Sequence, residues 1–138
     1  MNKYLAKIIA TDKEGLQMIS ACSSGAKVKV SDIKYLESNK VFLLSIERIK
    51  VENENEDKKV NSICRFDFVD KVKSKNIDQS NQELVLELVG IDYLKNNDVY
   101  EINLFFSNNA HIALTAETIE AILEDPVSYT HLTLPTKA

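Results

Sequence analysis

Residues 99–114 read VYEINLFFSNNAHIAL, and the alternation in this stretch decides the fold class. Apolar and polar side chains alternate before the Ser-Asn-Asn segment and again after it, which is the period of a β-strand with one buried face. We predict two antiparallel strands in which Phe106 pairs with Ile112 and Leu104 pairs with Leu114. The residues predicted to face inward are Tyr100, Ile102, Leu104, Phe106, Ile112 and Leu114.

The same period recurs in four stretches upstream, so most of the chain is predicted to form an antiparallel sheet. These strands are expected at residues 27–30, 41–49, 62–75 and 84–93, with a bulge at Gly90. On the 62–75 strand, Cys64, Phe66, Phe68 and Val72 are predicted to face inward and Arg65, Asp67, Lys71, Lys73 and Lys75 to face outward. The charged stretch at residues 51–59, VENENEDKK, is predicted to be a solvated loop.

Two short segments carry helix signals. Thr11 followed by Glu14 forms a capping-box pattern, and the helix that it starts is predicted to end near Gly25. Thr115 is the predicted N-cap of a second helix, with apolar residues at i, i+3 and i+4 on one face. Those apolar residues are Ile119, Ile122 and Leu123. The expected fold is therefore α+β, with an N-terminal helix, about six to seven mostly antiparallel strands and a short C-terminal helix. Such strands would form a curved sheet or half-barrel that resembles the pleckstrin-homology fold.

The amino-acid composition limits the classes of protein to which the chain could belong. The chain has 138 residues, a formal net charge of −4, 44% hydrophobic residues and 28% charged residues, which is typical of one soluble globular domain. No apolar run approaches the ~18 residues of a membrane helix. The acidic balance argues against a nucleic-acid partner. Because the N-terminus lacks the layout of a signal peptide, we expect a cytoplasmic protein with reduced cysteines.

The last segment, residues 126–138, reads PVSYTHLTLPTKA and resembles a translated sequencing adaptor. One reading frame of a transposon-type adaptor encodes every residue from Val127 to Thr136 in order. We therefore predict a single domain over residues 1–125 and a non-native tail over 126–138. Excluding the tail leaves His111 as the one histidine of the domain.

No catalytic residue, cofactor site or metal site is predicted. Cys22 and Cys64 do not form a CxxC motif and are expected to be buried structural thiols. His111 has no partners at the spacing of zinc ligands and is expected to face solvent. Arg65 and Asp67 are expected to form a surface ion pair. The sequence leans toward a protein without enzymatic activity.

One surface feature suggests a binding partner, namely the row of cations on the outer face of the predicted 62–75 strand. Arg65, Lys71, Lys73 and Lys75 could contact an anionic partner. Three interpretations remain open at this point: a solvated face that protects an edge strand, a site for an acidic protein, or a site for the phosphates of nucleic acid or lipid.

Four segments carry a resemblance to a known family. They are ATDKEGLQMISA (10–21), VKVSDIKYL (28–36), RFDFV with the following KSKNID (65–69 and 73–78) and the spaced pattern that ends in LED (112–125). Over residues 5–125 the chain resembles the bacterial family known as domain of unknown function 2948. The resemblance implies a small cytoplasmic bacterial protein and supplies no activity, cofactor or catalytic residue.

The functional hypothesis is a non-catalytic module that binds an unidentified protein partner or a second copy of itself. The first alternative is a small-molecule-binding protein or small enzyme with its site at the mouth of the sheet or barrel. The second alternative is a phosphate-backbone binder that uses Lys71, Lys73 and Lys75.

Overall fold

The computed structural model describes residues 7–53 and 56–125, which form ten strands and one α-helix. The helix α1 spans Lys13–Ser23, and three short 3₁₀ turns lie at Val30–Asp32, Glu37–Asn39 and Ser107–Asn109. The strands are β1 (Lys7–Ala10), β2 (Lys27–Lys29), β3 (Ile33–Leu36), β4 (Val41–Asn53), β5 (Glu56–Phe66), β6 (Val69–Lys75), β7 (Val85–Asn96), β8 (Val99–Phe106), β9 (His111–Ala116) and β10 (Ala121–Glu124).

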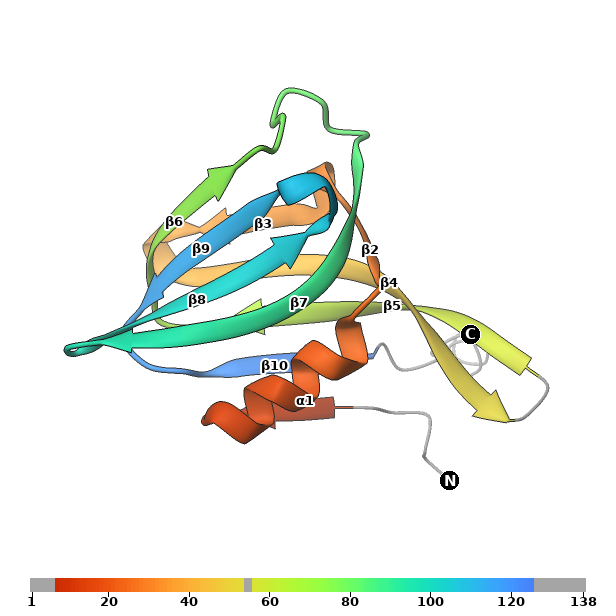
Figure 1. Ribbon diagram of the computed structural model, residues 1–138, viewed down its shortest axis with the longest axis horizontal. Coiled ribbons are helices and arrows are strands. Elements are labelled where there is room, and N and C mark those ends of the chain that lie inside the picture. The colour runs from red at the N-terminus through yellow and green to blue at the C-terminus, as the bar shows by residue number, and fades with distance from the viewer. Residues whose placement is uncertain (1–6, 54–55, 126–138) are drawn as a thin grey trace, which may run out of the picture.

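All the strands belong to one open antiparallel sheet. Its order is β1-β10-β5-β4-β2-β7-β8-β9-β6, and β3 pairs with the beginning of β4 beside β2. The sheet folds over so that β6, β7, β8 and β9 lie across from β3, β4, β5 and β10 (Figure 1). The inner faces of both halves contribute to a single hydrophobic core, with Phe42 and Phe66 from one half and Leu104 and Leu114 from the other.

The predicted N-terminal helix is confirmed with a shift of one residue at its start. Asp12, not Thr11, is the N-cap, and its carboxylate accepts a hydrogen bond of 2.8 Å from the Gly15 N–H. Gly25 follows the C-cap residue with a φ of 87°, which is the left-handed conformation that glycine adopts most readily. The helix buries Leu16 and Ile19 against β1, β7 and β10.

The β8–β9 hairpin confirms the predicted faces but not the predicted register. Leu104 pairs with Ile112, and Ile102 pairs with Leu114, so β9 is displaced by two residues. The turn at Ser107–Asn109 sets this register, because the Phe106 N–H donates to the carbonyl of the residue that follows the turn. A two-residue shift preserves which side chains face inward, so the alternation alone could not distinguish the two registers.

The predicted strand at 62–75 is two strands, because the chain turns at Phe68. β5 ends at Phe66, β6 begins at Val69, and Phe68 lies between them with a φ of 60° and 43% of its surface exposed. The Asp67 N–H donates to the Glu120 carbonyl, and the Phe68 carbonyl accepts from the Glu117 N–H. The predicted inward position of Phe68 is therefore wrong, and the turn carries the chain from one half of the sheet to the other.

The predicted loop at 51–59 is also wrong. β4 continues to Asn53 and β5 starts at Glu56, so the two strands pair almost to the end of their hairpin, which projects from the body of the molecule (Figure 1). A charged stretch can form a hairpin as well as a loop, because strand pairing satisfies the backbone groups whatever the side chains are.

The fold-class prediction is wrong at the C-terminal end. Instead of a helix the chain forms β10, which lies between β1 and β5. Ala121 and Leu123 are fully buried while Ile122 and Glu124 are partly exposed, a period of two rather than 3.6. The fold is thus an open antiparallel sheet with one described helix, and it is not a pleckstrin-homology-like half-barrel closed by a C-terminal helix.

Candidate binding surface

Three of the predicted site residues share one face of an edge strand. β6 ends the strand order, and Lys71, Lys73 and Lys75 lie exposed on its outer face. They stand opposite Thr115, Ala113 and His111 of β9. We call Lys71, Lys73 and Lys75 the lysine face. Within residues 7–53 and 56–125 no carboxylate forms an ion pair with any of the three.

The fourth predicted residue, Arg65, is separated from the lysine face. It lies on β5, which is third in the strand order, whereas β6 is last. Its Nε lies 2.9 Å from Asp67 Oδ1, so the predicted surface ion pair is confirmed. The turn at Phe68 causes this separation, because the lysines no longer continue the face on which Arg65 lies.

An aromatic pair borders the lysine face. The rings of Phe105 and His111 stack with centroids 5.1 Å apart and an interplanar angle of 9°. His111 Nε2 lies 2.8 Å from Asn103 Oδ1, so the predicted solvent-facing histidine is partly exposed and has a polar neighbour. Lys75, Phe105 and His111 line a surface hollow of about 530 Å³ that also includes Val89. The lysine face therefore continues into an exposed aromatic surface.

The inner side of β6 borders an opening in the sheet. β6 and β3 each have one edge with no paired strand among the described residues, and we call the region between these edges the seam. Hydrogen bonds and ion pairs close the seam at one end. The Val69 N–H donates to the Lys40 carbonyl at 2.9 Å, and the Tyr35 hydroxyl donates to the Val69 carbonyl at 2.8 Å. Lys40 Nζ also bridges Asp70 and Glu117, at 3.0 and 2.9 Å.

A pocket of about 330 Å³ opens at the seam, and we call it the seam pocket. Its floor reaches the core at Phe42 and Ile112, and its neutral polar residues are Ser74, Gln79 and Gln82. Gln79 Nε2 donates to Ser74 Oγ at 2.8 Å. The other lining residues are Val30, Ile33, Tyr35, Val72 and Ile77. Burial raises the pKa of the Tyr35 hydroxyl, and the charges of Glu37 and Asp70 add to this effect, so the whole lining is neutral near pH 7.

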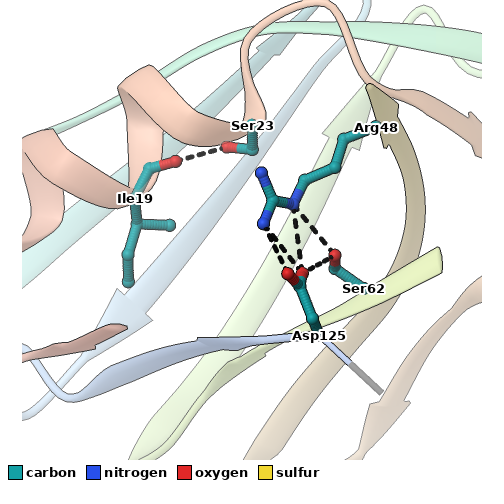
Figure 2. A network of polar contacts seen from close by, with 5 residues as sticks. All are labelled: Ile19, Ser23, Arg48, Ser62 and Asp125. Atoms are coloured by element: carbon teal, nitrogen blue, oxygen red, sulfur yellow. Dashed lines mark hydrogen bonds and ion pairs between the residues drawn. The ribbon is translucent and has the colours of Figure 1, made fainter. Parts of the chain in front are cut away.

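A buried polar cluster lies elsewhere, near the end of α1 (Figure 2). Arg48 Nη2 donates to both carboxylate oxygens of Asp125 at 2.8 Å, and Arg48 Nε donates to Ser62 Oγ at 3.0 Å. Ser62 donates to Asp125 in turn. Ser23 Oγ donates to the Ile19 carbonyl at 2.6 Å within the helix. Because the opposite charges neutralise each other within hydrogen-bond distance, the buried charges of this cluster are paired and it presents no reactive group.

Sequence reasoning missed this cluster, although a signal for part of it exists. Arg48 follows Phe42, Leu44 and Ile46 at the inward positions of β4, so the alternation places a charge inside the sheet. A charge at an inward position requires a buried partner. The alternation does not identify Asp125 as that partner.

The prediction that both cysteines are buried is correct for Cys64 and wrong for Cys22. Cys64 is fully buried on the inner face of β5, and burial raises the pKa of its thiol to about 12. Cys22 is exposed, because the buried face of α1 is formed by Leu16, Ile19 and Ser23. In the part of the chain that the structure describes, no group of His, Cys, Asp and Glu side chains could hold a metal ion. None of the described helices is long and apolar enough to cross a membrane.

These features define the class of protein: an open antiparallel sheet whose exposed edge strand carries cations on one face and lines an uncharged pocket with the other. The chain belongs to the family described as "Protein of unknown function (DUF2948)", which it matches over residues 6–136. The family resemblance is thereby confirmed. No curated protein and no solved structure matches the chain. The predicted non-native tail, residues 126–138, lies outside the described residues.

Proposed function

We propose that the protein is a non-catalytic interaction module that binds an acidic protein partner through the lysine face. The observation that carries the proposal is the row of three exposed lysines at alternate positions of one edge strand, none of which forms an ion pair in the described structure. Four other cations have acidic partners, namely Lys29 with Glu83, Lys40 with Asp70 and Glu117, Arg48 with Asp125, and Arg65 with Asp67. Exposed lysines elsewhere in the described structure, such as Lys13 and Lys59, also lack an ion pair, so it is the row of three on one strand that distinguishes the lysine face. We further propose that the protein acts in the bacterial cytoplasm, where the exposed Cys22 thiol would stay reduced.

The spacing of the lysines suits an extended array of acidic groups. Alternate residues of a strand are roughly 7 Å apart along its axis, so the lysine face presents three ammonium groups in a row. Each exposed ion pair contributes only ~0–1 kcal/mol, so several must form together. A local cationic face on a chain with a net charge of −4 would also orient an acidic partner as it approaches.

The bordering aromatic pair adds apolar contact area. Phe105 is 42% exposed and Val89 is 55% exposed beside it. Interfaces are enriched in aromatic residues at their centres, while charged pairs at the rim contribute orientation more than affinity. We propose that Phe105 and His111 add apolar contact area at one end of the lysine face and that the lysine face fixes the orientation of the partner.

Charge reversal tests the proposal. The variant Lys71→Glu/Lys73→Glu/Lys75→Glu is compared with Lys13→Glu/Lys27→Glu/Lys59→Glu, which makes the same charge change at exposed lysines on α1, β2 and β5. Binding to fluorescent poly-L-glutamate and to duplex DNA is measured by anisotropy at two salt concentrations. We expect polyglutamate to bind the wild type and the control variant, and to lose at least tenfold in affinity for the lysine-face variant. Equal binding by the two variants would refute the proposal. Stronger binding of DNA would favour the phosphate-backbone alternative.

A further inference from the structure

We infer that the acidic partner binds as an extended strand along the unpaired edge of β6, with alternating acidic and apolar residues. The acidic side chains would face the lysine face, and the apolar side chains would enter the seam pocket. This inference rests on the proposed function and names the kind of partner: a short peptide segment with acidic residues at every second position.

The first support is the state of the β6 edge. β6 pairs with β9 on one side, and no strand pairs with its other side in the described residues. The hydrogen bonds and ion pairs that close the seam involve only Val69 and Asp70 of β6, which are the first residues of the strand. Their partners are Lys40, Tyr35 and, through Lys40, Glu117. The backbone groups from Lys71 to Lys75 lie outside the part of the seam that these contacts close. An extended peptide can add to such an edge through main-chain hydrogen bonds.

The second support is the alternation within β6 itself. Lys71, Lys73 and Lys75 face outward, whereas Val72 and Ser74 line the seam pocket. A strand that pairs with β6 has the same period of two, so its successive side chains point to these same two faces. One peptide can therefore contact the lysine face and the seam pocket at once.

The third support is the difference in charge between the two faces. The lining of the seam pocket contains no Asp, Glu, Lys or Arg, so it matches uncharged side chains. The lysine face carries three cations, which would repel a basic strand and attract an acidic one. Lysines on an edge strand also prevent pairing between copies of the same chain. The arrangement thus excludes strands of the wrong charge and admits one with alternating acidic and apolar residues.

The length of the partner segment follows from where the edge begins and ends. Asn76 leaves the strand with a φ of 61°, and its side chain donates to the Asn109 carbonyl at 2.9 Å. The accessible edge therefore runs from Lys71 to Lys75. A segment of about five residues, three acidic and two apolar, matches this edge at the rise of a β-strand.

Peptide order tests the inference independently of charge. The probes are fluorescein-labelled peptides with the sequence Glu-Val-Glu-Val-Glu and a block isomer, Glu-Glu-Glu-Val-Val, measured by anisotropy against the full chain at low salt. We expect the alternating peptide to bind at least tenfold more tightly than the block isomer. Two further peptides carry N-methyl groups either at the Glu positions or at the Val positions. Because alternate residues of a strand present their N–H groups to opposite edges, only one of these two should lose binding.

The outcomes separate the two proposals. If all four peptides bind equally and all lose binding to the lysine-face variant, the strand inference is overturned and the proposed function stands. If none of the peptides binds but polyglutamate binds as expected, the strand inference is overturned and the proposed function stands. If polyglutamate does not bind either, both are overturned. On the protein, Ser74→Glu places a charge at the seam pocket at an exposed residue, so its folding should be preserved, which circular dichroism checks. We expect this variant to lose at least fivefold in affinity for the alternating peptide, and an unchanged affinity would also overturn the strand inference.

Discussion

Asp125 lies 77 residues after Arg48 in the chain, yet its two carboxylate oxygens each accept a hydrogen bond of 2.8 Å from Arg48 Nη2. The pair is nearly inaccessible to solvent, with 8% of Arg48 and 1% of Asp125 exposed. It joins the inner face of β4 to the residue that follows β10. A contact so distant in sequence and so deeply buried ties the last described residue to the inner face of β4.

Removing one partner of this pair should destabilise the protein strongly. Asp125→Ala leaves the Arg48 guanidinium buried without its counter-ion, and we expect a loss of about 3–5 kcal/mol in the free energy of unfolding. Urea denaturation followed by circular dichroism measures it. The matched control, Arg48→Met/Asp125→Leu, removes both charges and should recover most of the loss. A loss below about 1 kcal/mol for Asp125→Ala would contradict the structural role of the pair.

The buried Cys64 thiol should make stability fall at alkaline pH. Burial raises its pKa in the folded state to about 12, from 9.0 for a free thiol. Below pH 9 both states hold the proton, and between these values the unfolded state releases it while the folded state retains it. The free energy of unfolding should therefore fall by up to about 1.4 kcal/mol per pH unit in that range.

The measurement compares the wild type with Cys64→Ala at pH 8 and pH 10.5, because other groups titrate in the same range. The wild type should lose more stability than Cys64→Ala between these two values. Cys22→Ser, at the exposed cysteine, serves as the control and should follow the wild type. Parallel pH profiles for the wild type and Cys64→Ala would show that the thiol is accessible to hydroxide in the folded state.

Two glycines should respond differently to substitution by alanine. A Cβ at Gly15 would lie 2.8 Å from the Ala10 Cα, whereas a Cβ at Gly90 would meet no atom closer than Ser20 Oγ at 3.7 Å. Alanine normally stabilises a helix interior relative to glycine by about 1 kcal/mol. We nevertheless expect Gly15→Ala to destabilise by about 1–3 kcal/mol through overpacking, and Gly90→Ala to change stability by less than about 1 kcal/mol. Thermal unfolding of both variants checks the contrast, which a stabilised Gly15→Ala would contradict.

We also propose that residues 126–138 are not encoded by the natural gene, because Val127 through Thr136 follow an adaptor sequence. Sequencing of the genomic locus should give different codons after Asp125. Removal of residues 126–138 should leave the midpoint of thermal unfolding within about 2 °C of the full chain, since the predicted domain ends at Asp125. Genomic codons that match the tail would disprove the proposal outright.

Alternation predicted the faces of the strands well, because a side chain's face follows directly from its position in a strand. Phe66, Leu104 and Leu114 are buried as the pattern indicates. Register and strand ends were not predictable in the same way. The turn at Phe68 depends on hydrogen bonds to Glu117 and Glu120, which are distant in sequence.

The C-terminal segment shows why short apolar stretches mislead. Ile119, Ile122 and Leu123 fit the spacing of a helix, but Ile119, Ala121 and Leu123 fit a strand equally well and are the buried set. The unpaired edges of β1 and β5 decide between the two, and a local window of sequence does not contain them. For the same reason the lysine face was partly predictable from alternation, whereas the seam pocket was not, because it depends on which strands end the sheet.

The position of β10 between β1 and β5 has a consequence for synthesis. β1 has no strand neighbour other than β10 in the described sheet, so residues 7–10 leave the ribosome long before residues 121–124 can pair with them. Until then both β1 and β5 present an open edge to the surroundings of the nascent chain. The sheet can therefore be completed only after residues 121–124 have been synthesised, and chaperones that shield exposed strand edges would act during that interval.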